Sequence, residues 1–106
     1  MRQLSALIIA VITGFSAGAL AASQAVYQKG RVFSATSLTI KKGTAVTFIN
    51  DDTVPHNIYS ESKNNEFNLG AQAPGTSTDV TFDQAGQVKI MCAIHPRMMM
   101  TVQVEN

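Results

Sequence analysis

The stretch that decides the fold lies near the C-terminal end and reads Val88-Lys89-Ile90-Met91-Cys92-Ala93-Ile94-His95-Pro96-Arg97-Met98-Met99-Met100-Thr101-Val102-Gln103-Val104. Apolar and polar residues alternate on both sides of a short central loop, which is the pattern of half-buried strands. The first segment places Val88, Ile90 and Cys92 on one face. The second segment places Val102 and Val104 on one face. The stretch therefore predicts two strands joined by a tight loop.

The same pattern recurs upstream, which extends the prediction to the whole domain. Strand-like segments are expected at 25–28, 38–41, 44–50, 56–60 and 78–82, and turns at 42–43, 74–75 and 83–86, the last of hairpin type. Asp51 and Asp52 are expected to form a solvated turn. Several short strands, with no helical pattern after the leader, predict an all-β sandwich built from antiparallel sheets with one solvated face.

The N-terminal segment has the layout of a targeting sequence. A basic start at Arg2 precedes an apolar run over 4–20, and Ala19-Leu20-Ala21 fits a small-x-small cleavage site. The alternative is a membrane anchor, but the run is short for a span and glycines interrupt it. We therefore predict a signal peptide over 1–21, a mature domain over 22–106, export to the periplasm, and no membrane span after cleavage.

The charge and the cysteine content of the mature domain argue against some classes of function. Without Arg2 the mature domain has seven basic and seven acidic side chains, so no charge excess favours nucleic acid or an anionic membrane. The single cysteine, Cys92, cannot form an intramolecular disulfide. A lone thiol is a liability in an oxidising compartment unless something occupies it. A bound metal would protect the thiol and would add folding energy.

The residues around Cys92 suggest which metal. The chain has two histidines, His56 and His95, and the loop after Cys92 ends at Met98. Thiolate and thioether suit Cu(I), imidazole suits Cu(II), and a site that combines them is typical of blue copper. Pro96 restricts His95 to extended conformations and stiffens the loop. The alternative for Cys92 and Met98 is that each is core packing.

Other kinds of site find no support in the sequence. There is no second cysteine for a structural zinc site, and no glycine-rich phosphate loop. His95 follows Cys92 too closely to serve as the base of a cysteine hydrolase. We therefore predict that the protein is not an enzyme.

The motif Cys92-x-x-His95-Pro96-x-Met98 resembles the ligand loop of the small type 1 (blue) copper proteins of the cupredoxin family, which are amicyanin-, pseudoazurin- or plastocyanin-like. The segment 46–57 is similar to the family's strand and loop that carry the first histidine, and 67–75 and 82–86 also resemble family segments. The resemblance covers essentially all of the mature chain. It implies a Greek-key β-sandwich.

The resemblance also implies a ligand set. One copper ion, cycling between Cu(I) and Cu(II), would be held by three equatorial ligands and the axial thioether of Met98; the equatorial ligands are His56, Cys92 and His95. Asn57 would brace the ligand loop and donate its backbone N–H to the thiolate. The run 98–100 departs from the family pattern: by register, Met99 would point outward and Met100 inward.

The implied function is the transfer of single electrons between a donor and an acceptor redox protein by a monomer that docks transiently. Family members dock through an apolar surface around the loop histidine, and here the residues expected to form it are Val54, Pro55, Ala93, Ile94, Pro96 and Met99. A neutral domain implies weak electrostatic steering, with Arg97 and Lys89 as a local positive bias. Two alternatives stay open: copper carriage or tolerance, suggested by Met99 and Met100, and a metal-free sandwich.

Overall fold

The computed structural model describes residues 24–106, so the predicted signal peptide over 1–21 lies outside the described residues. The described part contains nine strands and no helix. The strands are β1 (Gln24–Lys29), β2 (Val32–Phe33), β3 (Ser37–Lys41), β4 (Thr44–Asn50), β5 (Ile58–Ser60), β6 (Phe67–Asn68), β7 (Ser77–Phe82), β8 (Gly86–Cys92) and β9 (Met99–Glu105). Within 24–106 no apolar helix of membrane-spanning length is present.

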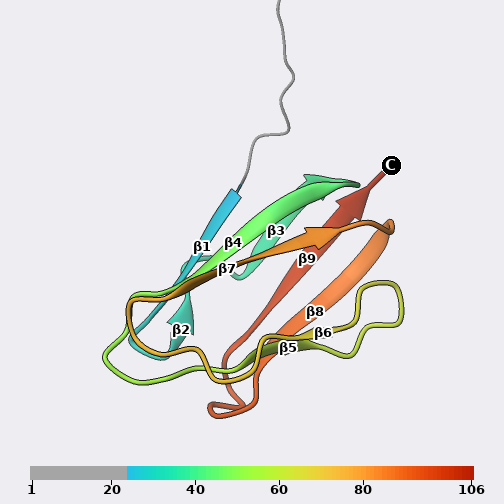
Figure 1. Ribbon diagram of the computed structural model, residues 1–106. Helices are drawn as coiled ribbons and strands as arrows, with labels where there is room; N and C mark the ends of the chain where they lie inside the picture. Colours follow the sequence, from blue (N-terminus) through green and yellow to red (C-terminus); the bar gives the residue numbers. More distant parts are fainter. Residues whose placement is uncertain (1–23) are drawn as a thin grey trace, which may run out of the picture.

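The strands form two sheets that pack face to face (Figure 1). One sheet has the order β2-β1-β4-β7, and the other has the order β3-β9-β8-β5-β6. The predicted all-β sandwich is thereby confirmed. The pairing differs from a wholly antiparallel one at two places, because β1–β4 and β3–β9 run parallel. A parallel pair needs a crossover connection, and the chain between β1 and β4 makes one by passing through β3 in the opposite sheet.

The turn over 83–86 corrects one expectation. It was predicted to close a hairpin, but β7 pairs with β4 and β8 pairs with β9 and β5. The turn therefore carries the chain from one sheet to the other. Gly86 has a φ of 122°, a backbone conformation that residues other than glycine rarely adopt. Gly43, in the turn between β3 and β4, also joins strands of different sheets, and its N–H donates to the Phe82 carbonyl at 2.7 Å.

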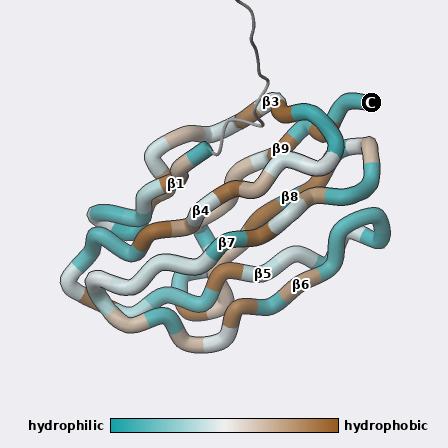
Figure 2. Tube along the Cα trace, turned by 45° about the horizontal axis from the view of Figure 1, so that its top comes forward, coloured by the Kyte–Doolittle hydropathy of each residue, from teal (hydrophilic) through white to brown (hydrophobic). Residues whose placement is uncertain are grey.

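The core lies between the sheets, as the alternation predicted. Hydrophobic positions recur along β4, β8 and β9, while the connecting loops are mostly hydrophilic (Figure 2). Phe48 and Phe82 are fully buried, and Phe67 contacts both rings, with centroids 6.2 and 6.0 Å away. Burying one such side chain contributes about 1.5–3 kcal/mol. The outward positions Lys89 and Gln103 are exposed, so both strands have the predicted register.

One end of the sandwich gathers the segments that carry the candidate ligands. The β4–β5 connection and the β8–β9 loop lie at this end (Figure 1). The Ala93 N–H donates to the Asn57 carbonyl at 2.9 Å, which joins the two segments. Asp51 donates its N–H to the Gln28 carbonyl at 2.9 Å and so attaches the β4–β5 connection to β1.

Candidate metal centre

The strand ladder between β5 and β8 fixes the position of Cys92, which is the last residue of β8. It ends β8, where it pairs with Ile58 of β5, and its side chain is 1% exposed. The chain then turns at once: the Met98 N–H donates to the His95 carbonyl at 2.9 Å, and the Cys92 N–H approaches the Met98 carbonyl at 3.3 Å. The short loop therefore returns to its starting point, and the thiol points into the sandwich.

His56 is fixed independently of that loop. It is fully buried and forms an isolated bridge with Gln72, with reciprocal backbone hydrogen bonds of 3.1 and 2.7 Å. The Asn50 side chain donates to the carbonyls of Gln72 and Val54, at 2.8 and 3.0 Å. These bonds hold the β4–β5 connection in one shape, which fixes the position of the imidazole.

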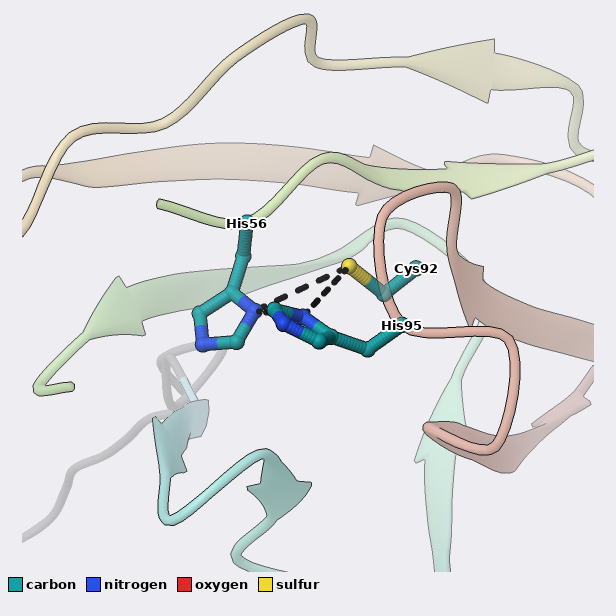
Figure 3. A group of neighbouring side chains, drawn as sticks. All are labelled: His56, Cys92 and His95. Atoms are coloured by element: carbon teal, nitrogen blue, oxygen red, sulfur yellow. Dashed lines mark hydrogen bonds between the residues drawn. The ribbon is translucent and has the colours of Figure 1, made fainter. Parts of the chain in front are cut away.

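The side chains of His56, Cys92 and His95 converge from these two segments (Figure 3). The Cys92 Sγ atom lies 3.7 Å from His56 Nδ1 and 3.9 Å from His95 Nδ1, and the two Nδ1 atoms are 3.1 Å apart. Cys92 and His56 are buried, while His95 is half-buried. The structure thus brings together the three residues that the family resemblance implied as equatorial ligands.

The three donor atoms fit one metal ion. With metal–nitrogen distances of about 2.0 Å and metal–sulfur distances of about 2.3 Å, a trigonal arrangement separates nitrogen from sulfur by about 3.8 Å. The observed separations of 3.7 and 3.9 Å agree with that value, while the 3.1 Å between the two nitrogens is shorter than the roughly 3.5 Å of an ideal trigonal set. Two imidazoles and one thiolate in a trigonal set are the donors of a blue copper site.

The outer edge of His56 contacts a carboxylate. His56 Nε2 lies 3.0 Å from Asp52 Oδ2, and the Asp52 side chain is 9% exposed. The same oxygen accepts the Arg31 N–H at 2.8 Å. The Arg31 backbone and then the His56 ring are the largest causes that hold the pKa of Asp52 well below its usual range, against an opposing effect of burial. A charged carboxylate can only accept hydrogen bonds, so at this contact the donor would be the Nε2 atom of His56.

This contact corrects the expectation that Asp51 and Asp52 form a solvated turn. Asp51 is exposed, but Asp52 is partly buried against a candidate ligand. The signal in the sequence was the four-residue spacing between Asp52 and His56. The spacing could not reveal the second contact, because Arg31 lies 21 residues upstream of Asp52.

Asn57 lies against the thiol. Its backbone N–H points to Cys92 Sγ at 3.4 Å, and its carbonyl accepts the Ala93 N–H at 2.9 Å. Its side-chain amide donates to Asn68 Oδ1 at 2.8 Å, which links the ligand segment to β6. A hydrogen bond to the thiolate lowers the electron density on sulfur, so this residue is positioned to tune a bound metal.

The three consecutive methionines take three different positions. Met98 is 2% exposed and ends the ligand loop, and Met100 is 3% exposed within the core. Met99 is 48% exposed. The predicted outward Met99 and inward Met100 are therefore confirmed, whereas an axial role for Met98 stays a prediction.

The residues expected at the docking surface are mostly exposed. Ile94 and Met99 are 47% and 48% exposed, Pro55, Ala93 and Pro96 are exposed, and Val54 is half-buried. The structure adds Arg31, which lines a shallow hollow together with Ile94, His95, Pro96 and Arg97. His95 thus lies beside an apolar surface with two arginines in the same hollow.

Comparisons with known proteins agree with this geometry. Methylamine utilization protein MauL of Methylorubrum extorquens is 32% identical over 63% of the chain, and the match spans 60% of that protein. A purple cupredoxin from Nitrosopumilus maritimus is 30% identical, with a TM-score of 0.69 over 77% of this chain and 99% of that one. A mutant of amicyanin in the Cu(I) form is 27% identical, with a TM-score of 0.71 over 78% and 82% of the respective chains.

The family assignment rests on most of the chain. The model of the copper-binding proteins of the plastocyanin/azurin family matches residues 21–105. That range contains the two histidines, the cysteine and the loop methionine described above. The chain therefore belongs to the plastocyanin/azurin family of copper-binding proteins and is a small blue copper protein with the cupredoxin fold.

Proposed function

We propose that this copper protein carries single electrons between two larger redox proteins, through an ion held by His56, Cys92, His95 and, axially, Met98. Membership of the plastocyanin/azurin family of copper-binding proteins supports an electron-transfer role. The observation that supports His56, Cys92 and His95 as ligands is the approach of two imidazole nitrogens and one sulfur to within 3.1–3.9 Å. Copper in such a site supplies a one-electron couple between Cu(I) and Cu(II).

The protein contributes fixed donors. Cys92 is held by a strand ladder and His56 by the Gln72 bridge, so neither position depends on the ion. Donors that already stand at ligand distances have little to rearrange when the charge of the ion changes. Buried side chains at His56 and Cys92 also exclude water from the thiolate. Both features favour rapid transfer over ligand exchange.

The half-buried His95 is the proposed exit for the electron. A partner would dock on the surrounding apolar surface, formed by Val54, Pro55, Ala93, Ile94, Pro96 and Met99. Transient redox encounters use small interfaces of this kind. Export to the periplasm is part of the same proposal and follows from the signal peptide predicted over 1–21. The protein would act as a monomer, and the proposal requires no substrate or bond-making step.

The main alternative is copper carriage or tolerance. Met99 is exposed beside the ligand loop and pairs in register with Met91, which places two thioethers on one outer face of the sheet. Thioethers suit Cu(I). However, Met100 is buried in the core, so the run of methionines does not form a continuous surface cluster. A carrier of copper would pass its metal to a competing apo-protein, whereas an electron carrier would retain it through repeated oxidation and reduction.

The decisive experiment is a Cu(II) titration of the purified protein followed by absorption and EPR spectroscopy, with Cys92→Ala beside it. We expect an intense blue or purple thiolate-to-copper band, with narrow hyperfine splitting, that the substitution abolishes. Met99→Ala is the matched control, because it removes an exposed sulfur outside the proposed ligand set. A weak tetragonal spectrum that Cys92→Ala leaves unchanged would contradict the proposed ligand set.

A further inference from the structure

The Asp52 carboxylate connects the β1–β2 turn to the buried ligand His56. Its Oδ2 atom lies 2.8 Å from the Arg31 nitrogen and 3.0 Å from His56 Nε2. Its Oδ1 atom accepts the Thr53 N–H at 2.9 Å, and its own N–H donates to Asn50 Oδ1 at 2.9 Å. The side chain is therefore fixed at both oxygens and has one orientation.

The β1–β2 turn has an unusual backbone that serves this contact. Gly30 and Arg31 have φ angles of 63° and 60°, and Arg31 is the one non-glycine residue with positive φ among the residues the structure describes. Two successive left-handed residues are typical of a tight two-residue hairpin. An arginine in this conformation is uncommon, and the hydrogen bond from its N–H to Asp52 offsets part of the cost. Strain of this kind concentrates at functional sites.

The position of the carboxylate matters because a single imidazole ring separates it from the Nδ1 atom of His56 that faces Cys92. His56 is fully buried, so little water screens a charge behind it. A carboxylate that accepts the second ring N–H of a ligating histidine fixes the tautomer and makes the ring a stronger donor. A negative charge at this range also favours the more highly charged state of the metal.

We propose that Asp52 is a positioning residue that fixes the Nε2–H tautomer of His56 and lowers the reduction potential of the copper centre. This inference rests on the proposed function, because it requires His56 to be a ligand. At a separation of about 7 Å and an effective dielectric constant near 20, one unit charge changes the relative affinity for Cu(II) and Cu(I) by roughly tenfold to fiftyfold.

The test compares two substitutions that remove the same formal charge. Asp52→Asn keeps the size of the side chain and one accepting oxygen. Asp51→Asn is the matched control, since Asp51 is exposed and lies 3.9 Å from Lys29 rather than near a ligand. We expect Asp52→Asn to keep the intense charge-transfer band and to raise the potential by at least the equivalent of tenfold in relative affinity, which is about 59 mV for one electron. Asp51→Asn should shift it by less than a third of that amount.

A second measurement uses the metal-free protein. Long-range ¹H–¹⁵N NMR spectra distinguish the two tautomers of an imidazole, and we expect His56 to be protonated on Nε2 in the wild type. Asp52→Ala removes the acceptor and should reduce that preference. If this variant does not fold, the wild-type spectrum and the potential of Asp52→Asn still decide the matter.

The outcomes separate this inference from the proposed function. If the wild type and both asparagine variants show the intense band but have equal potentials, Asp52 has no such role, and the ligand assignment stands. An Nδ1–H tautomer of His56 in the metal-free wild type would also overturn the inference. If the wild type shows no such band, the proposed function fails and this inference fails with it.

Discussion

The axial assignment of Met98 can be tested with a pair of substitutions that the chain itself provides. Met98 and Met100 are two residues apart, and their side chains are 2% and 3% exposed. Met98 ends the ligand loop, while Met100 pairs with Ile90 inside the second sheet. Met98→Leu and Met100→Leu each replace a buried thioether by a hydrocarbon of similar volume. Any difference between the variants therefore reports on the role of the sulfur rather than on packing.

The expected cost in stability is small for both variants. A volume-conserving exchange of methionine for leucine in a core costs less than about 1.5 kcal/mol. For a domain of 60–100 residues, each kcal/mol shifts Tm by about 4–8 °C. We therefore expect both metal-free variants to unfold no more than about 12 °C below the wild type and within a few degrees of each other.

The expected effect on copper differs between the two. Loss of an axial donor leaves three ligands in a more apolar site, which favours the less charged Cu(I) state and raises the reduction potential. A tenfold change in relative affinity corresponds to about 59 mV. We expect Met98→Leu to raise the potential by at least this amount and to change the EPR spectrum, and Met100→Leu to do neither.

Cyclic voltammetry measures both potentials, and thermal unfolding of the metal-free proteins measures the shared packing cost. An unchanged potential in Met98→Leu would refute the axial assignment. A shift confined to Met100→Leu would mean that the loop has another register in the metal-bound state.

Two further predictions concern the core and the docking surface. Gln28 is fully buried, and within residues 24–106 neither polar atom of its side chain has a hydrogen-bond partner. We expect Gln28→Met to raise Tm by about 4–8 °C, because it removes the cost of burying these unpaired polar atoms, which is roughly 1 kcal/mol. Gln72→Met is the control and should lower Tm, since Gln72 donates to the Phe48 carbonyl at 2.9 Å; a lower Tm for Gln28→Met would contradict the prediction. Ile94→Asp should slow electron self-exchange between Cu(I) and Cu(II) copies at least tenfold in NMR line-broadening experiments, because it sets like charges face to face. Tyr27→Asp, on β1, should have little effect, and equal rates for the two variants would mean that copies do not meet at the Ile94 surface.

The inward position of Cys92 and the nearness of His95 could be expected from the sequence because strand alternation is a local property, whereas the approach of His56 followed from the family resemblance. Alternation places Cys92 inward at a strand end, and the short interval to His95 keeps the second donor nearby. The same reasoning placed Met99 outward and Met100 inward. Each conclusion needed the strand period and a loop too short to reach elsewhere.

The position of Asp52 could not be predicted because it depends on a long-range contact. Two adjacent acids after a strand usually form a solvated turn, and the four-residue spacing to His56 is the one local feature that distinguishes Asp52 from Asp51. The difference arises when the β1–β2 turn brings the Arg31 N–H to one carboxylate and not to the other. The turn over 83–86 was misjudged for a related reason, because turn residues show where a chain reverses but not which sheet the next strand joins.

The distribution of hydrogen bonds around the site explains how a small domain with one cysteine can hold donors in place without a disulfide. Cys92 is fixed by its ladder to β5, and His56 by Gln72 on one side and Asp52 on the other. His95, by contrast, lies on a short loop that is closed by two backbone bonds, from the Met98 N–H to the His95 carbonyl and from the Cys92 N–H to the Met98 carbonyl. Two donors are thus rigid and buried, and the third is half-buried beside an apolar surface. Under the proposed function, this arrangement would hold the ligands still around the thiolate and would leave His95 as the donor nearest to a docked partner.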